Sequence, residues 1–442
     1  MANKSKIVHD PIHGSITIAP PFLDILDRHE MQRIRSVKQL GLGDLVFPGA
    51  NHTRFEHCLG VYHLSGRMGK VLDLDDEDVT ALMAAGLLHD VCHAPFSHTL
   101  EESMESITGR NHMDLARDLI FGKIPTFMER DRDILDGIDS ISEILEDGGI
   151  SADMVCDLIA YPKSTLGPFH IGDETPYFSS RDYMHQVIHG PVDSDQMDYL
   201  LRDAHYTGVK LGTIDMERLL SQMVKYNDQL VLKRGGIVAA EGLVVSRLLM
   251  HSSVYFHKTI RTAEMMLVKA VDEAMDQGCD MSEMYLMTDS DLIQRLMSFG
   301  GKASDITRNI MLRRLYKKAY ILYFSSLSDD DVIELARYAS DSNVRKELEG
   351  RIAARAGVDV SDVIVDMPPR SALLSEQKIG KTDVNILDGG RIRTLSSFST
   401  LARSLQSRSN FDWALMVSAP AGMEGAVAKA ARNIIGIEDV TL

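Results

Sequence analysis

Two histidines and two aspartates stand out in this chain because their side chains can together bind a metal ion. They are His57, His89, Asp90 and Asp195, and they come from three segments far apart in the sequence. Imidazole nitrogens and carboxylate oxygens without thiolate suit iron, manganese, zinc, nickel, cobalt or magnesium. The residues therefore indicate one divalent metal ion, and they do not choose among these metals.

The adjacent pair His89-Asp90 follows an apolar run over residues 81–88. This run predicts a buried helix that carries both residues and places His93 one turn beyond His89. A buried carboxylate is costly unless it is paired or binds a cation. The ordinary alternative is a core histidine hydrogen-bonded to its neighbouring carboxylate. A second copy of the dipeptide, His9-Asp10, precedes Pro11 and has no helical context.

A series of short motifs makes the chain resemble the HD-domain metal-dependent phosphohydrolases and, within them, the deoxynucleoside triphosphate triphosphohydrolases. The motifs lie between residue 6 and about residue 261 and include Asp10-Pro11-Ile12-His13-Gly14, Arg54-Phe55-Glu56-His57, His89-Asp90, Pro95-Phe96-Ser97-His98 and Asp198-Tyr199. The resemblance implies that His57, His89, Asp90 and Asp195 ligate one divalent metal ion per subunit. It also implies hydrolysis of a deoxynucleoside triphosphate to deoxynucleoside and inorganic triphosphate.

The same resemblance implies a set of residues around the substrate phosphates. They are His93, His98 and His112 beside the α-phosphate, with Arg54, Arg247 and Lys258 as further phosphate contacts. Hydrolysis requires a proton for the leaving sugar oxygen, and His98 is the candidate acid. Glu101, three residues later on the same helical face, would orient His98. His112 is the alternative acid.

The spacing of Asp195, Tyr199 and Asp203 places all three on one face of a helix. By resemblance, Tyr199 and Tyr255 close the space beside the second carbon of the sugar, and Asp203 holds its 3′ hydroxyl. Gln39 matches a further sugar or base contact. The ordinary alternative is that the two tyrosines are core aromatics with solvated hydroxyl groups.

Two departures from the family pattern concern affinity and regulation. Gln196 stands where the family often has lysine. Without that cation, the affinity for the triphosphate and the preference for it are open. Asp27 and Arg35 match the pair that reads a guanine nucleotide effector, GTP or dGTP, at a subunit interface in some relatives. His9 replaces the asparagine expected beside that pair. The alternative for Asp27 and Arg35 is a solvated pair of surface charges.

Composition restricts the other classes of partner. The 442-residue chain has a formal charge of −17 and a pI of about 5.4, which disfavours broad nucleic-acid binding. Its four cysteines show no CxxC pairing, so we expect a reduced, cytoplasmic environment. No signal peptide and no run of about 18 apolar residues is evident, so we expect no membrane association.

The periodicity predicts a mainly α fold with a short N-terminal β-hairpin over residues 6–20 and a smaller α+β C-terminal lobe. The resemblance implies that the helical core is an HD domain. We place the phosphohydrolase domain at residues 1–300 and the lobe at 301–442, where it would cap the site, join subunits or hold a regulator. Glycine, proline and serine between residues 170 and 180 indicate a loop that would act as a lid.

Three functions remain open from the sequence. The first is the triphosphohydrolase, as a homo-dimer or homo-tetramer by resemblance. The second is an HD phosphohydrolase that acts on another nucleotide, such as a monophosphate, a cyclic nucleotide or a signalling nucleotide. The third is a nucleotide sensor without turnover, and the complete set of metal ligands argues against it.

Overall fold

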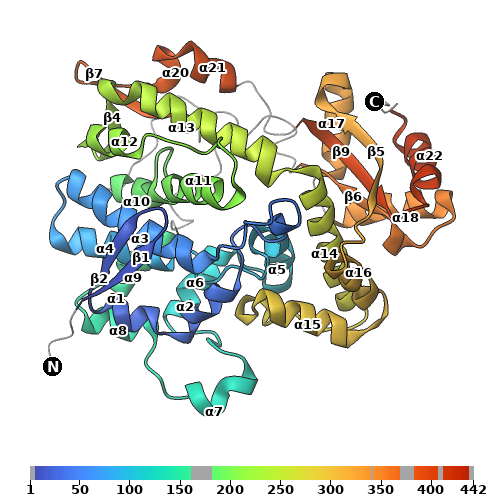
Figure 1. The fold of residues 1–442 in the computed structure, drawn as a ribbon, viewed down its shortest axis with the longest axis horizontal. Helices are drawn as coiled ribbons and strands as arrows, with labels where there is room; N and C mark the ends of the chain where they lie inside the picture. Colours follow the sequence, from blue (N-terminus) through green and yellow to red (C-terminus); the bar gives the residue numbers. More distant parts are fainter. Residues whose placement is uncertain (1–4, 161–181, 340–341, 369–382, 407–411, 438–442) are drawn as a thin grey trace.

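Helices make up most of the molecule, as predicted, and short sheets lie at the N-terminus and in the C-terminal region (Figure 1). The computed structural model describes residues 5–160, 182–339, 342–368, 383–406 and 412–437. The predicted lid over residues 170–180 lies outside these ranges. The four cysteines are free.

The predicted N-terminal hairpin is confirmed. Strand β1 (Lys6–Asp10) pairs antiparallel with β2 (Gly14–Ile18), and a turn with Gly14 at φ 74° joins them. Ile16 and Ile18 are completely buried. A hairpin of two strands is marginal alone, so packing against the helices stabilises this one.

Three helices position the predicted metal ligands: α3 (Arg54–Val71) and α11 (Ser194–Thr207), which carry His57 and Asp195, and α4 (Asp76–Leu88), which His89 and Asp90 directly follow. Each begins at a residue that caps free backbone N–H groups. Asp75 accepts from the N–H of Asp78 at 2.9 Å, and Asp193 accepts from that of Gln196 at 2.7 Å. Such caps satisfy donors that have no partner inside the helix and so fix where it starts.

Helices α3 and α4 pack closely because α4 has a glycine at their contact. A Cβ atom on Gly86 would lie 2.7 Å from Ser65 Oγ and 3.0 Å from the Val61 carbonyl oxygen. Close contact between these two helices brings His57 on α3 near His89 and Asp90, which directly follow α4.

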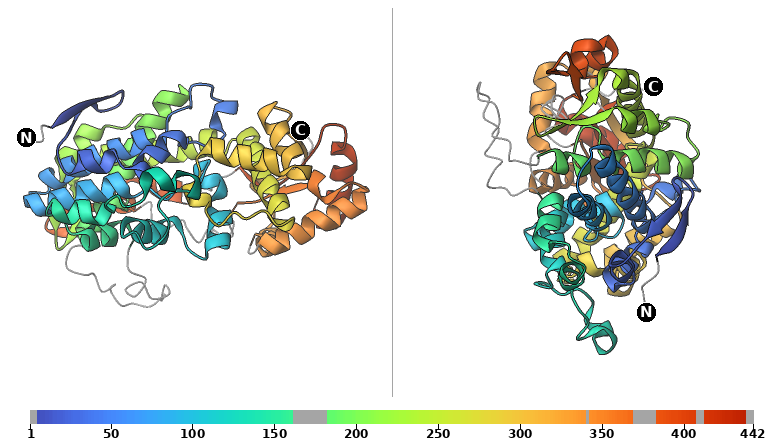
Figure 2. Two further views of the ribbon diagram at one scale, coloured as in Figure 1. Left: turned by 90° about the horizontal axis from the view of Figure 1, so that it is seen from below. Right: turned by 90° about the vertical axis from the view of Figure 1, so that its left-hand side faces the viewer.

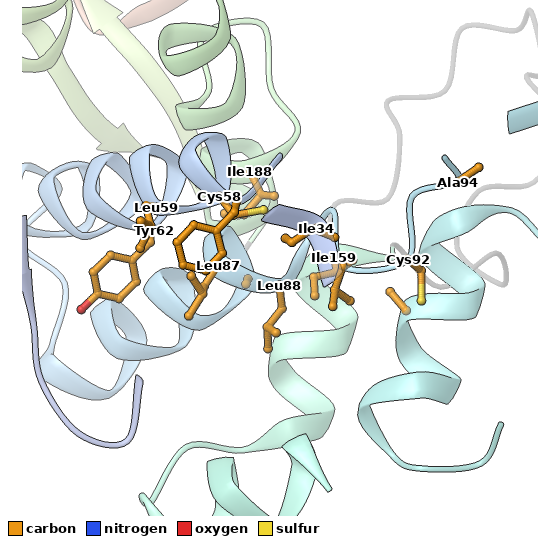
Figure 3. Close-up of a cluster of buried hydrophobic side chains, with 14 of the residues drawn as sticks. Ile34, Cys58, Leu59, Tyr62, Leu87, Leu88, Cys92, Ala94, Ile159 and Ile188 are labelled. Carbon is orange, nitrogen blue, oxygen red and sulfur yellow. The ribbon is translucent and has the colours of Figure 1, made fainter. Parts of the chain in front are cut away.

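The remaining helices of the larger core surround these three. They are α1 (Phe22–Leu26), α2 (His29–Arg33), α5 (Glu101–Thr108), α6 (His112–Ile120), α7 (Arg132–Leu135), α8 (Ile141–Asp147), α9 (Ala152–Ile159), α10 (Asp182–Ile188), α12 (Met216–Gln222), α13 (Ile237–Met250), α14 (Lys258–Asp276), α15 (Asp289–Phe299) and α16 (Gly301–Met311). Figure 3 shows side chains from α3, α4, α9 and α10 in their common core: Cys58, Leu59, Tyr62, Leu87, Leu88, Ile159 and Ile188.

A four-stranded sheet joins distant parts of the chain. Its order is β3 (Met223–Tyr226), β4 (Gln229–Lys233), β7 (Asn385–Asp388) and β8 (Arg391–Thr394). Strand β4 pairs parallel with β7 through Leu232 and Ile386. Helices α20 (Leu395–Phe398) and α21 (Thr400–Gln406) follow and lie beside α13, away from the C-terminus (Figure 1). The C-terminal region thus contributes to the larger core.

A second core forms the α+β lobe at one end of the molecule (Figure 2, left). Its sheet has the order β5 (Lys317–Tyr323), β9 (Trp413–Ala419) and β6 (Ile364–Asp366), all antiparallel. Helices α17 (Asp329–Tyr338), α18 (Ser342–Ala356) and α22 (Glu424–Ile435) pack on it. The boundary at residue 300 stays a prediction, and the two cores alternate along the sequence.

One helical stretch among the described residues, Arg234–Tyr255, is long and apolar enough in composition to span a membrane. Within its apolar window, 44% of the residues are buried inside the fold. A core helix has the same property, and the expected lack of membrane association stays a prediction.

Candidate functional site

His57, His89 and Asp90 converge in a buried cluster, in which one ligand atom from each lies within 4.8 Å of the others. His57 lies on α3, and His89 and Asp90 lie at and just beyond the end of α4. The structure therefore brings together three of the four predicted ligands, from two helices in contact.

The expectation that one helix carries His89, Asp90 and His93 is wrong, because α4 ends at Leu88. His89 caps this helix, and the chain then turns. The guanidinium of Arg33 on α2 donates to the carbonyl oxygens of Val91 at 2.8 Å and His93 at 2.9 Å. These bonds occupy carbonyl groups that a longer helix would use, and the turn leaves His93 Nε2 3.1 Å from Asp90 Oδ1.

The fourth predicted ligand, Asp195, reaches the cluster from the first turn of α11. Its Oδ1 atom lies 3.0 Å from His57 Nε2 and 3.8 Å from His89 Nε2. Asp195 is 32% exposed, whereas the His57 side chain is completely buried. The carboxylate of Asp195 thus forms the more open side of the cluster.

The two imidazole rings are held with the same nitrogen toward the cluster. His57 Nδ1 donates to Asp198 Oδ2 at 2.8 Å, and His89 Nδ1 donates to the Gly86 carbonyl at 2.9 Å. Both Nε2 atoms are buried and have no hydrogen-bond partner within the described ranges. Burial without a partner is costly, and this ring orientation is typical of metal-binding histidines. The donor set therefore fits a divalent metal ion.

The electrostatics of the cluster keep its acids ionised. Burial works against the charged form of Asp90, but the Arg54 guanidinium and His89 outweigh it and hold the pKa of that carboxyl well below its usual range. Burial also opposes a charged His57, yet the carboxylates of Asp195 and Asp198, one beside each ring nitrogen, raise its pKa to about 10. Binding of a metal ion at His57 then requires release of a proton.

Arg54, the first residue of α3, is 1% exposed and lies between the cluster and the following loop. Its Nη1 atom forms an ion pair with Asp90, and its Nε atom donates to Ser97 Oγ at 2.8 Å. Its Nη2 atom has no partner in the described part of the chain. One edge of the guanidinium is thus fixed, and Nη2 is a buried donor of the kind that suits a phosphate oxygen; the role of Arg54 as a phosphate contact stays a prediction.

The predicted catalytic histidines gather beside Asp90. His93 stacks on His112 with ring centroids 4.3 Å apart and meets His98 edge-on at 5.0 Å. Glu101 accepts from His98 Nδ1 at 3.0 Å and forms an ion pair with His112. Burial opposes ionisation of Glu101, but the bonds from His112 and His98 prevail and lower its pKa. The structure thus brings these four residues together.

The loop that carries His98 has a strained backbone. Phe96 and Ser97 have φ values of 57° and 56°, a left-handed conformation that is unfavourable for residues other than glycine. Asp289, the first residue of α15, accepts from the N–H of Phe96 at 2.7 Å and from that of Lys38 at 3.0 Å. A residue far along the sequence therefore holds this loop in place.

The residues predicted to select the sugar also meet. Tyr199 and Tyr255 lie edge-on with ring centroids 6.1 Å apart. The Tyr255 hydroxyl donates to Asp203 Oδ2 at 2.7 Å, and His52 Nε2 lies 2.7 Å from Asp203 Oδ1. Asp203 is therefore held by two neighbours on the same side of α11 as Tyr199.

The predicted phosphate contacts on α13 and α14 have protein partners in the described structure. Arg247 Nη1 donates to Gln196 Oε1 at 3.1 Å. Lys258 Nζ forms an ion pair with Asp412 at 3.0 Å, toward the α+β lobe. Burial lowers the pKa of Lys258, but the bond to Asp412 outweighs it and raises that pKa. Their roles as phosphate contacts stay predictions.

The remaining predicted residues are scattered. Asp27 and Arg35 are both exposed, and the Arg35 guanidinium carbon lies 3.8 Å from the centre of the Phe55 ring. Gln39 is buried, and its Oε1 atom has no hydrogen-bond partner among the described residues. The effector role of Asp27 and Arg35 and the substrate role of Gln39 stay predictions.

Sequence reasoning gave no role to several buried polar residues behind the cluster. They are Asp10, His13, His52, Asp198 and Arg202, and the partly buried Asp289, which holds the loop of His98, was missed as well. A signal for some of them was present in the sequence, because Asp10-Pro11-Ile12-His13-Gly14 and Asp198-Tyr199 are among the motifs shared with the phosphohydrolase family. A single sequence does not reveal that Asp10 and Arg202 meet.

The comparisons with known proteins define the family. The model of the HD domain matches residues 54–159, and that of the HD associated region matches residues 214–442, more than half of the chain. The chain belongs to the HD-domain family of phosphohydrolases that carry an HD associated region.

Its relatives include proteins with and without a named activity. An uncharacterised protein of Methanocaldococcus jannaschii is 30% identical, over 94% of this chain and 79% of that protein. Deoxynucleoside triphosphate triphosphohydrolase SAMHD1 of Homo sapiens is 28% identical, over 71% of this chain. The match covers 54% of SAMHD1, so the chain spans about half the length of that relative. A hypothetical protein from Aquifex aeolicus of known structure has a TM-score of 0.69 at 26% identity, over 97% of this chain and all of its own.

Proposed function

We propose that this protein hydrolyses deoxynucleoside triphosphates to deoxynucleoside and inorganic triphosphate. The observation that carries the proposal is the pair of unpartnered Nε2 atoms of His57 and His89, which face Asp90 and Asp195 beside the cluster of His93, His98 and His112. A divalent metal ion held by His57, His89, Asp90 and Asp195 would neutralise charge on phosphate oxygens.

The other residues have separate tasks in this reaction. The free face of the Arg54 guanidinium binds a phosphate oxygen and opposes the charge that develops during phosphoryl transfer. His98 is 71% exposed and is held at Nδ1 by Glu101, so Nε2 is available to give a proton to the leaving sugar oxygen. His112, on the other oxygen of Glu101, is the alternative donor.

Deoxyribose is the preferred sugar in this proposal. The edge-on pair of Tyr199 and Tyr255 limits the space next to Asp203, and Asp203 accepts a hydrogen bond from the 3′ hydroxyl. An additional 2′ hydroxyl would press against the tyrosine pair. Hydrophobic contact alone gives modest selectivity, about 10- to 200-fold for a small group.

Activation by a guanine nucleotide is a second part of the proposal. Asp27 and Arg35 are the effector contacts in this proposal. Arg313, Lys317 and Lys318, which line a surface cavity of about 210 Å³ at the start of α14, are a further group of cations. Such a cluster of cations in a protein of charge −17 suits an anionic ligand. We also propose that the protein assembles into a dimer or tetramer. Light scattering on the purified protein, with and without GTP, measures this assembly.

The test uses the protein loaded with Mn²⁺ and each of the four deoxynucleotides, with and without GTP, and identifies the products by chromatography. Release of inorganic tripolyphosphate that is lost in His98→Ala supports the proposal. Pyrophosphate or monophosphate as the product would favour the second function, an HD phosphohydrolase for another nucleotide. Nucleotide binding without any product, unchanged in a double variant with alanine at residues 89 and 90, would favour the sensor.

A further inference from the structure

A buried carboxylate behind the metal cluster connects three elements that are far apart in the sequence. Asp198 on α11 accepts at Oδ2 from His57 Nδ1 and Arg202 Nε, both at 2.8 Å. At Oδ1 it accepts from Arg202 Nη2 at 2.9 Å and lies 2.6 Å from His13 Nε2. Asp198 therefore meets a predicted metal ligand on one side and the N-terminal hairpin on the other.

The hairpin is attached to this carboxylate by a second buried acid. Arg202 Nη1 donates to Asp10 Oδ2 at 2.8 Å. Asp10 Oδ1 accepts from the backbone N–H groups of Ile12 at 2.9 Å and His13 at 2.8 Å, which shapes the turn between β1 and β2. The side chains of Asp10, His13, Asp198 and Arg202 are 0–3% exposed, so water does not replace these bonds.

Helix α3 has a glycine, Gly60, at the point where this network passes it. A Cβ atom on Gly60 would lie 1.8 Å from Asp198 Oδ1 and 2.6 Å from Arg202 Nη2. The space above Gly60 is thus filled by the carboxylate and the guanidinium. Gly60 lies three residues after His57, so the same turn of α3 carries the ligand and admits the network.

The network has an excess of negative charge when both imidazoles are neutral. Asp10 and Asp198 carry two negative charges, and Arg202 supplies one positive charge. A buried charge must be compensated. Without metal the proton on His57 does this, and once that proton is displaced the divalent cation beside the other nitrogen of His57 does so with a larger charge. Docking of the hairpin and binding of a cation should therefore stabilise each other.

We propose that Asp198 is a positioning residue that couples the docked N-terminal hairpin to metal binding. In this inference, which rests on the proposed metal site, Asp10, His13 and Arg202 fix Asp198, and Asp198 keeps Nε2 of His57 directed at the metal. By linkage, the metal ion must in turn stabilise the docked hairpin. A two-stranded hairpin is only marginally stable alone. In this inference it both covers the core and helps to fix Asp198.

The first test measures the hairpin directly. Hydrogen exchange of the backbone amides in residues 6–18 is followed by mass spectrometry in the full-length protein, with Mn²⁺ and with EDTA. Removal of Mn²⁺ is expected to accelerate this exchange about fivefold or more, while peptides from β5 and β9 keep their rates. Equal exchange of the hairpin in both conditions overturns the inference.

The second test measures the reverse effect, on the affinity for Mn²⁺ by titration calorimetry. Asp10→Asn keeps the acceptor for the turn and removes the charge that faces Arg202, and it should weaken Mn²⁺ binding about 10-fold or more. His13→Ala should weaken it, whereas His13→Gln keeps a donor toward Asp198 and should restore most of it. His9→Gln is the matched control on the same strand as Asp10, because within the described residues the His9 side chain forms a hydrogen bond only with Ser15 Oγ, at 3.3 Å.

The outcomes separate this inference from the proposed function. If the natural protein binds Mn²⁺ and Asp10→Asn and His13→Ala bind it equally well, the coupling is refuted and the metal site stands. If the natural protein binds no Mn²⁺, both fall. If Asp10→Asn does not fold, the pair His13→Ala and His13→Gln decides, since a role in folding alone would change thermal stability without changing the affinity for Mn²⁺.

Discussion

Replacing Arg54 with glutamine should make the stability of the protein depend on bound metal. Arg54 and Asp90 are 1% and 4% exposed and form a buried ion pair. Removal of one partner of a buried pair leaves the other charge uncompensated and costs about 3–5 kcal/mol. Without metal, Arg54→Gln should therefore lower the free energy of unfolding by about this amount.

With metal bound, the loss should be much smaller. Asp90 belongs to the ligand cluster, so a divalent cation compensates the same carboxylate. What remains is the lost hydrogen bond to Ser97, about 1 kcal/mol. For cooperative unfolding of 442 residues, the entropy of unfolding is about 0.9 kcal/mol per kelvin. The variant should thus melt about 3–5 °C lower in EDTA and about 1 °C lower in Mn²⁺.

Differential scanning calorimetry of both proteins in EDTA and in Mn²⁺ measures these shifts. The matched control is Arg67→Gln on the same helix, whose partner Glu217 lies 2.7 Å away and is 71% exposed. Such surface pairs contribute about 0–1 kcal/mol, and metal should not change their effect. An equal shift of Arg54→Gln in EDTA and Mn²⁺ would refute the argument that Asp90 is shared between Arg54 and a metal ion.

Three further predictions concern turnover, sugar selection and pH. Glu101→Gln leaves one acceptor oxygen for two histidines. We therefore expect kcat of tripolyphosphate release to fall about 10- to 100-fold while KM stays within twofold. An unchanged kcat would contradict the role of Glu101. Tyr199→Ala should lower the ratio of kcat/KM for a deoxynucleotide over its ribonucleotide about tenfold, measured by competition, and a constant ratio would exclude Tyr199 from selection. Burial, with neighbouring His189, lowers the pKa of His185 to about 4, so between pH 6.5 and 4 the unfolded chain binds a proton that the folded chain does not. Stability should therefore fall as the pH drops through this window, by about 2 kcal/mol at pH 5 from this residue, and urea unfolding of His185→Gln should show a shallower fall; the same slope in both proteins would contradict it.

The helical character could be predicted because its signals are local, whereas the candidate ligands were assigned through the resemblance to a known family. The apolar run before His89 and the spacing of Asp195, Tyr199 and Asp203 each lie within a few helical turns. The structure has α4 and α11 at these places. The hairpin over residues 6–18 was equally local, since Gly14 marks its turn.

Other features could not be predicted, because they depend on contacts between distant residues. The end of α4 at Leu88 depends on hydrogen bonds from Arg33, and the residues between 88 and 93 contain no local signal for the end of a helix. Asp10 has a proline after it and looks like an ordinary turn residue, yet it is the buried partner of Arg202. The parallel pairing of β4 with β7 joins two short strands that carry no mutual pattern.

The pairing of β4 with β7 also delays completion of the four-stranded sheet during synthesis of the protein. Strand β4 leaves the ribosome long before β7, and at about 5–20 residues per second the delay is about 10–30 s. During this time the edge of β4 has free backbone groups, to which a chaperone or another nascent copy can add a strand. A ribosome that stalls after residue 316 would release a chain with every predicted metal ligand but with an open sheet. We expect chaperones and proteases to recognise such a chain by the unpaired edge of β4.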